Sequence, residues 1–176
     1  MKCEGFGCQE IAADGTKVLG CDTVYAVNKE HFLKNWIPIN DSKELLNILN
    51  LYELPKKVDI VLTGGEPLIY ANESIFVEFL ETLHLRGHRI TFETNGSLRV
   101  DFEQYPIYKK CIFALSVKLE NSNEPFSKRV RGDVINSIAT NAKEAFFKFS
   151  IDAESINLGL EEEIAEITLH SPNTQV

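Results

Sequence analysis

The stretch VDIVLTGGEP, residues 58–67, decides the fold because it joins a short apolar run to a Gly-Gly turn. A short apolar run that ends in a turn is typical of a buried strand. Residues 73–85 follow with apolar side chains at helical spacing, and Gly87 suits the C-terminal cap of that helix. Residues 89–93 form a second strand-like run that ends at a Thr-Asn-Gly turn. This order of strand, helix and strand predicts a parallel sheet with right-handed crossovers.

The same alternation extends to both sides of this unit. Upstream, Asp41 and Ser42 precede an apolar-periodic run, which predicts a capped helix that ends before Pro55. No repeat, low-complexity tract or linker interrupts the chain, so we expect one α/β domain over residues 1–176 with a mostly parallel sheet. Downstream, the pattern predicts strands at 112–119 and 146–151, helices at 133–145 and 158–169, and a strand that begins at 174–176.

Composition excludes several classes of function. The chain has 176 residues, of which 44% are hydrophobic, and a formal net charge of −8. This charge argues against direct binding of nucleic acid or of an anionic membrane surface, since phosphate binding needs clustered Lys and Arg. No run reaches the roughly 18 apolar residues of a membrane span, and no signal peptide is recognisable. We therefore expect a cytoplasmic protein whose thiols are reduced.

Three of the four cysteines, Cys3, Cys8 and Cys21, lie within the first 21 residues, in a Gly-rich stretch that predicts a loop over residues 1–25. In a reducing compartment such a group indicates metal ligands rather than disulfides. The spacing Cys-x4-Cys-x12-Cys differs from the paired short spacings of zinc sites, whereas thiolates are the usual holders of iron–sulfur clusters. Cys111 stands in an apolar run and is predicted to be a core residue.

Polar residues gather where the expected strands end. In parallel α/β sheets, ligands bind at the carboxyl ends of the strands, so these residues should share one rim. Glycine lets the backbone approach a ligand closely, and a lysine in the interior needs an anionic partner. Asn-Gly by itself would also suit a simple turn. The candidate rim residues are Thr63, Gly65, Glu66, Glu93, Asn95, Ser116 and Lys118.

Charged residues also occur at position 148 and at positions 161–163. Lys148 lies between two phenylalanines, which indicates either an interior lysine facing an anion or an outward lysine on an edge. Residues 161–163 are three consecutive glutamates, which predict a solvated first turn of a helix.

Four motifs in order carry a resemblance to a known family. They are Cys-Asp-Thr at 21–23, Thr-Gly-Gly-Glu-Pro at 63–67, Glu-Thr-Asn-Gly at 93–96 and Ser-Val-Lys at 116–118. The series resembles radical S-adenosylmethionine (SAM) enzymes, and within them the 7-carboxy-7-deazaguanine synthase family, over nearly the whole chain. The resemblance implies a partial (β/α) barrel of radical SAM type, in which residues 1–25 form the loop that binds a 4Fe-4S cluster.

The resemblance also implies roles for single residues. Thr63 would contact the substrate, and Thr23 would help to bind Mg²⁺, which prefers oxygen ligands. Cys3, Cys21 and Cys8 would be the candidate cluster ligands. SAM would be contacted by Gly65, Glu66, Glu93, Asn95, Ser116 and Lys118.

The cysteines depart from the family pattern Cys-x3-Cys-x2-Cys. Cys21 matches the last ligand, and Cys3 fits the middle one if residues 4–20 are an insertion. The first ligand would then precede Met1, which we favour because the expected first strand of the sheet is also missing; a C-terminal segment would be missing as well. Alternatively, Cys3, Cys8 and Cys21 are themselves the three ligands.

The activity that the resemblance implies is that of a lyase of queuosine biosynthesis. SAM would be cleaved reductively to a 5′-deoxyadenosyl radical, and 6-carboxy-5,6,7,8-tetrahydropterin would contract to 7-carboxy-7-deazaguanine with loss of ammonia. Relatives are homodimers, and the electron would come from a donor such as flavodoxin. Two alternatives stay open: an activase that places a glycyl radical on a partner enzyme, and a non-enzymatic α/β module stabilised by zinc.

Overall fold

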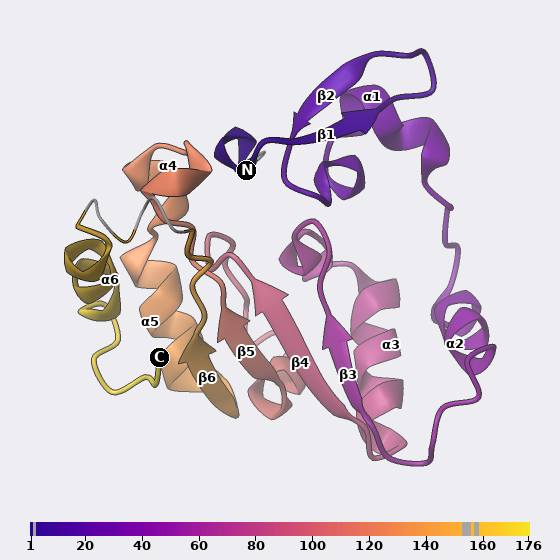
Figure 1. The fold of residues 1–176 in the computed structure, drawn as a ribbon. Coiled ribbons are helices and arrows are strands. Elements are labelled where there is room, and N and C mark those ends of the chain that lie inside the picture. The colour runs from indigo at the N-terminus through magenta and orange to yellow at the C-terminus, as the bar shows by residue number, and fades with distance from the viewer. Residues whose placement is uncertain (2, 153–155, 157–158) are drawn as a thin grey trace.

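The computed structural model describes residues 1, 3–152, 156 and 159–176, which form an α/β fold (Figure 1). Four parallel strands make one sheet in the order β3-β4-β5-β6. A separate two-stranded antiparallel sheet precedes it, and no barrel is formed by the described strands. The parallel strands are β3 (Asp59–Leu62), β4 (Arg89–Thr94), β5 (Ile112–Leu115) and β6 (Glu144–Phe147).

Within the described ranges, α-helices lie in two of the three connections between the parallel strands, a 3-10 turn lies in the third, and further helices precede and follow the sheet. The longer ones are α2 (Ser42–Asn50), α3 (Ser74–Leu85), α5 (Gly132–Asn141) and α6 (Leu160–Thr168). Two short helices are α1 (Lys29–Phe32) and α4 (Phe126–Arg129). Single 3-10 turns lie at Glu4–Phe6, Val24–Ala26, Leu33–Asn35, Pro67–Tyr70, Pro106–Lys110 and Glu120–Ser122. Among the described residues, no helix combines the length and apolarity that crossing a bilayer requires.

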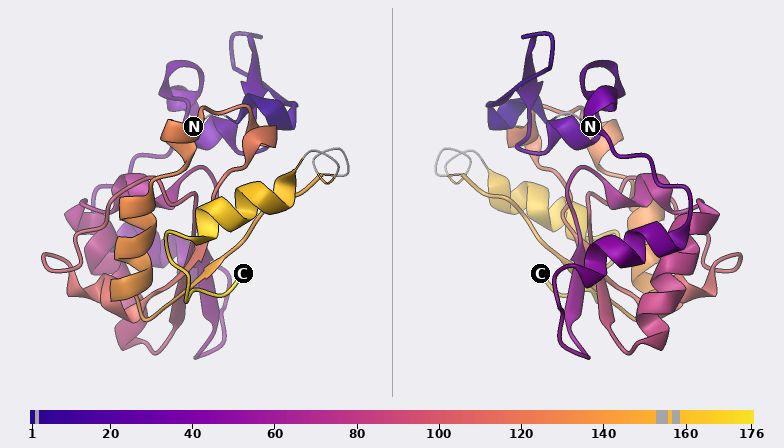
Figure 2. Two further views of the ribbon diagram at one scale, coloured as in Figure 1. Left: turned by 90° about the vertical axis from the view of Figure 1, so that its left-hand side faces the viewer. Right: turned by 90° about the vertical axis from the view of Figure 1, so that its right-hand side faces the viewer.

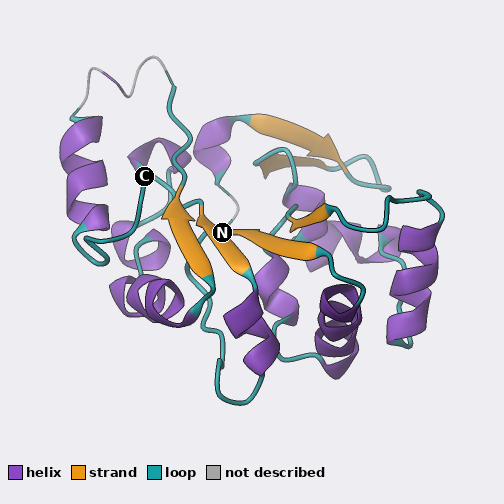
Figure 3. Ribbon diagram, turned by 90° about the horizontal axis from the view of Figure 1, so that it is seen from below, coloured by secondary structure: helices purple, strands orange, loops and turns teal. Residues whose placement is uncertain are grey.

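The main core lies between the sheet and the helices α3 and α5, which cover the same face of the sheet (Figure 3). Phe92 of β4 stacks on Phe113 of β5, with ring centroids 5.1 Å apart. Leu80 of α3 and Ile135 of α5 are fully buried against these strands. On the other face Val61 is half exposed. This second face is exposed at the edge strand β3 and covered at β5, where Ile112 and Ala114 are buried.

The expected order of strands and helices in the parallel sheet is confirmed, but four boundaries were wrong. The strand predicted over 112–119 ends at Leu115; the amide of Ser116 makes one more backbone hydrogen bond to β4, at the carbonyl of Thr94, and the chain then leaves the sheet. The helix predicted over 133–145 stops at Asn141, and β6 begins at Glu144 rather than at residue 146 and ends at Phe147 rather than at residue 151. Parallel pairing with β5 outweighs the helix propensity of residues 142–145.

The C-terminal expectations have mixed outcomes. The start predicted for the last helix, residue 158, lies outside the described residues, and α6 is described from Leu160. The strand expected to begin at 174–176 is present as a single parallel bridge between Phe146 and Gln175.

The loop expected over residues 3–25 was wrong in part, because it contains a β-hairpin. Strand β1 (Cys8–Ile11) pairs antiparallel with β2 (Lys17–Gly20), and Cys8 lies opposite Gly20. Asp14 closes the turn by accepting a hydrogen bond from the amide of Thr16. The hairpin has its own small cluster of buried residues, which consists of Ala12, Val18, Val24 and Phe32. Both side views place the hairpin and the N-terminus beyond the same end of the parallel sheet (Figure 2).

Candidate functional site

A cavity of about 530 Å³ lies between the hairpin segment and the carboxyl ends of the parallel strands. This volume is in the range of small-molecule sites. The three segments that were expected to share one rim do line this cavity together with all three N-terminal cysteines. Its lining residues are Met1, Cys3, Phe6, Cys8, Cys21, Asp22, Thr23, Val27, Thr63, Gly64, Gly65, Glu66, Glu93, Thr94, Asn95, Ser116, Lys118 and Ser150.

Glu66 ties two of the rim segments together from the inside. One carboxylate oxygen accepts the Thr94 hydroxyl at 2.7 Å and the Leu68 amide at 3.1 Å, and the other accepts the Asn95 amide at 2.8 Å. Burial raises the pKa of the carboxyl, while these hydrogen bonds and the nearby Lys118 ammonium act in the opposite direction. Glu66 therefore fixes the loop after β3 to the loop after β4.

The two glycines of the first rim segment have different surroundings. Both adopt positive φ, 78° at Gly64 and 63° at Gly65, which favours glycine at each position. A Cβ on Gly64 would meet open space, whereas one on Gly65 would lie 2.8 Å from the side chain of Val27. Gly65 thus lets the cysteine-bearing segment approach the end of β3 closely.

Lys118 brings a positive charge to the cavity. Its ammonium donates to the Ser116 hydroxyl at 3.3 Å and lies 5.7 Å from the centre of the Phe6 ring. No carboxylate of the described residues forms an ion pair with it. Ser116 and Lys118 fall within the strand that was predicted over 112–119, but both lie in the loop that follows β5. The ammonium is available to an anionic ligand.

Cys3 and Cys21 both line the cavity and lie near each other. Cys3 is buried, which raises the pKa of its thiol; the Lys118 ammonium lowers this pKa, and the nearby Cys21 raises it. The Cys21 sulfur lies 3.5 Å from the hydroxyl of Thr23. Cys8 lines the cavity too, and its sulfur lies 3.8 Å from the Phe6 carbonyl oxygen. No group of three or more His, Cys, Asp and Glu side chains is close enough to hold a single metal ion in the part of the chain that the structure describes.

Glu93 and Asn95 have partners within the chain. The Glu93 carboxylate pairs with Lys148 at 2.5 Å; this lysine therefore faces an anion, but its side chain is 49% exposed and it is not the interior lysine of the first alternative. The Asn95 side chain accepts the Ser97 amide at 3.0 Å, which is the turn role that Asn-Gly also suggested. Both residues still line the cavity.

Sequence reasoning missed some contributors to the site. Phe6, Val27 and Ser150 line the cavity although no motif marks them. The prediction that residues 161–163 form a solvated turn was wrong for Glu163, whose side chain is 16% exposed and pairs with Arg129.

The fourth cysteine belongs to the core, as expected, and this leads to a prediction. Cys111 is fully buried, and burial raises the pKa of its thiol to about 12. At pH 8, far below this pKa, only roughly one molecule in ten thousand carries the thiolate. We expect iodoacetamide to modify the partly exposed Cys8 in the folded protein and to leave Cys111 unmodified, as measured by peptide mass spectrometry. In urea both should react, and equal labelling of Cys8 and Cys111 in the folded state would contradict the structure.

The cavity offers thiols, an ammonium and backbone groups as possible ligands of the cofactors that the motifs suggest. Three thiols line the same cavity and are of the ligand type that iron–sulfur clusters use, although they form no close group of three in the part of the chain that the structure describes. An ammonium without a carboxylate partner and the backbone of Gly64 and Gly65 suit the carboxylate and amino groups of an amino acid. No family model matches the chain, and no curated protein matches its sequence.

Proposed function

We propose that the chain is a radical SAM enzyme and that its cavity at the strand ends holds SAM beside a 4Fe-4S cluster. The observation that carries this proposal is one shared cavity, which unites the thiols of Cys3 and Cys21, the Gly-Gly turn and the ammonium of Lys118, for which the described residues provide no ion-pair partner. The parallel sheet with helices on one face supports a partial (β/α) barrel of radical SAM type as its architecture.

Cys3 and Cys21 would hold the cluster, with Cys8 as the candidate for a third ligand. A bound cluster supplies the electron that cleaves SAM reductively. Gly65 and the carbonyls around it would receive the amino group of SAM, and Lys118 with Ser116 would bind its carboxylate. Glu66 is occupied by three donors of the chain, so we assign it the task of fixing the rim rather than of contacting SAM directly.

The remaining residues of the cavity would orient the substrate. We propose 6-carboxy-5,6,7,8-tetrahydropterin as substrate and 7-carboxy-7-deazaguanine as product, on the motif series at 21–23, 63–67, 93–96 and 116–118. Thr63 would contact the pterin, and the hydroxyl of Thr23 would bind Mg²⁺ together with substrate oxygens. Glu93 and Asn95 border the same space. The hairpin segment above the strand ends would exclude water, so that a reactive radical meets only the positioned substrate.

An anaerobic assay tests this proposal. The chain is reconstituted with iron and sulfide and is supplied with SAM, dithionite, Mg²⁺ and the carboxytetrahydropterin. We expect 5′-deoxyadenosine and 7-carboxy-7-deazaguanine in liquid chromatography with mass spectrometry. If 5′-deoxyadenosine forms without carboxydeazaguanine, the substrate assignment is wrong; if neither forms, the proposed function is wrong.

A further inference from the structure

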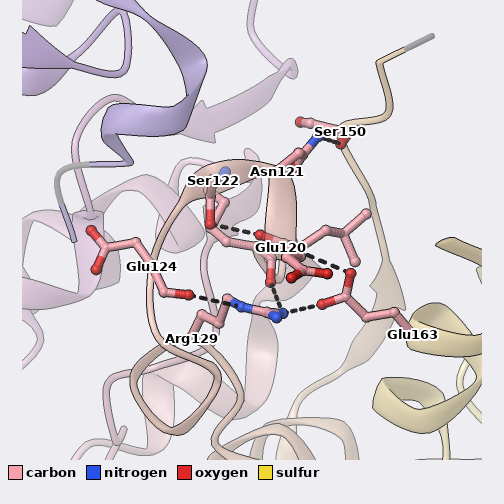
Figure 4. A network of polar contacts seen from close by, with 9 residues as sticks. Glu120, Asn121, Ser122, Glu124, Arg129, Ser150 and Glu163 are labelled. Carbon is pink, nitrogen blue, oxygen red and sulfur yellow. Dashed lines mark hydrogen bonds and ion pairs between the residues drawn. The ribbon is translucent and has the colours of Figure 1, made fainter. Parts of the chain in front are cut away.

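A buried arginine anchors the loop that follows β5. Arg129, at the end of α4, is 5% exposed, and its guanidinium donates to two backbone carbonyls, Lys118 at 3.0 Å and Glu124 at 3.1 Å (Figure 4). These two carbonyls lie six residues apart in sequence, so one planar side chain fixes both ends of the segment between them. A guanidinium suits this task because its donors have a fixed geometry.

Glu163 of α6 holds this arginine from the other side. One of its carboxylate oxygens pairs with the Arg129 guanidinium, and the other accepts the backbone amide of Glu120 at 3.1 Å. Both side chains of the pair are largely buried. Figure 4 shows how Glu163 reaches from α6 to the segment that carries Glu120 and Arg129. Removal of either partner of such a buried ion pair would leave the other charge buried without compensation, which is strongly destabilising.

The anchored segment in turn contacts the first cysteine. The Glu124 carboxylate accepts the backbone amide of Cys3 at 3.0 Å. Gly5 packs directly on the same segment, because a Cβ at this position would lie 2.1 Å from the Asn121 carbonyl oxygen. The position of Cys3 in the cavity therefore depends on residues 118–129 and not only on its own hairpin.

We propose that Arg129 is a positioning residue that, held by Glu163, sets both Lys118 and Cys3 in the cavity. The consequence for SAM rests on the proposed function, whereas the positioning of the two residues does not. Arg129 is absent from the lining of the cavity and is linked to it through the backbone of Lys118 and through Glu124. Its loss would loosen the ammonium and the thiol at once, although neither side chain is changed.

Two variants distinguish this positioning role of Arg129 from a purely stabilising role. In Arg129→Met combined with Glu163→Leu, apolar side chains replace the buried ion pair, which is often neutral or favourable for stability. Arg129→Lys keeps a positive charge for Glu163 but has no planar fork that can bridge the two carbonyls. Arg89→Met is the control, because it breaks an Arg–carboxylate pair with Asp59 at the opposite end of β3 and β4.

Hydrogen–deuterium exchange of residues 3–7 is the first readout, and it needs no cofactor. In both Arg129 variants we expect exchange about tenfold faster than in the unchanged chain, the factor that the loss of one ordinary hydrogen bond produces. Exchange of β4 and β5 should stay slow, and Arg89→Met should behave like the unchanged chain. If residues 3–7 exchange at the original rate in a folded Arg129→Lys protein, Arg129 does not position Cys3 and the inference fails.

Affinity for SAM, measured by equilibrium dialysis after reconstitution, is the second readout. We expect the dissociation constant to rise about tenfold in the folded variants. If exchange accelerates but affinity is unchanged, Arg129 does not set Lys118 for the ligand, and that half of the inference is wrong. If the unchanged chain binds no SAM while exchange accelerates in the variants, the proposed function fails and the positioning of Cys3 stands.

Discussion

If the proposed cluster site is correct, we expect Cys21→Ser to abolish both the retention of iron after anaerobic reconstitution and the cleavage of SAM. Serine is nearly isosteric with cysteine, but its hydroxyl is a poor ligand for iron–sulfur clusters, which are held by thiolates. Mutation of a residue that merely hydrogen-bonds to a metal ligand already lowers the affinity for the metal by about 10- to 100-fold. We therefore expect the loss of the ligand itself to lower this affinity by at least as much. Iron and sulfide analysis after gel filtration measures the first effect, and 5′-deoxyadenosine formation measures the second.

Two matched variants make this result specific. Cys111→Ala removes a thiol from the core, outside the cavity, and should keep the iron content of the unchanged chain. Cys8→Ser decides between the two sets of ligands: retained iron excludes Cys8 as a ligand, and lost iron makes it the third one. A Cys21→Ser protein that retains its iron and sulfide would remove the basis for the cluster at this site.

Glu66→Ala destabilises the fold by about 3 kcal/mol, which is the second large effect that we expect. The substitution leaves the Thr94 hydroxyl and the amides of Leu68 and Asn95 without their acceptor, and each buried donor without a partner costs roughly 1–3 kcal/mol. Urea denaturation followed by circular dichroism measures the change in the free energy of unfolding. Binding of SAM should weaken as well, because the loops after β3 and β4 lose their connection.

Glu103→Ala is the control for this variant. Glu103 pairs with Lys109 on the surface, where its side chain is 85% exposed, so its loss should change the free energy of unfolding by less than about 1 kcal/mol. Equal stability of the two variants would show that Glu66 does not tie the rim together.

The rim of the site could be predicted from the sequence, because it depends on topology alone. In a parallel sheet the carboxyl ends of all strands meet at one edge, so recognising strands at 58–62 and 89–93 was enough to bring Gly65 and Asn95 together. The core position of Cys111 followed from its apolar neighbours. These inferences do not require the orientation of individual side chains to be known.

Other features depend on contacts between distant residues, and the sequence does not show them. Val117 and Leu119 are buried although they lie beyond the end of β5, so their apolarity suggested a longer strand. The hairpin strands have four residues each, too few for a clear alternating pattern. Arg129 and Glu163 are 34 residues apart, and no local spacing links them.

The most direct test of the shared cavity is electron paramagnetic resonance of the reconstituted, dithionite-reduced chain with and without SAM. If Cys3 and Cys21 hold a cluster beside Gly65 and Lys118, a 4Fe-4S signal appears and its g values shift when SAM is added. A signal that is unchanged by SAM, or the absence of any iron–sulfur signal, would contradict the proposal that this cavity brings SAM to a cluster.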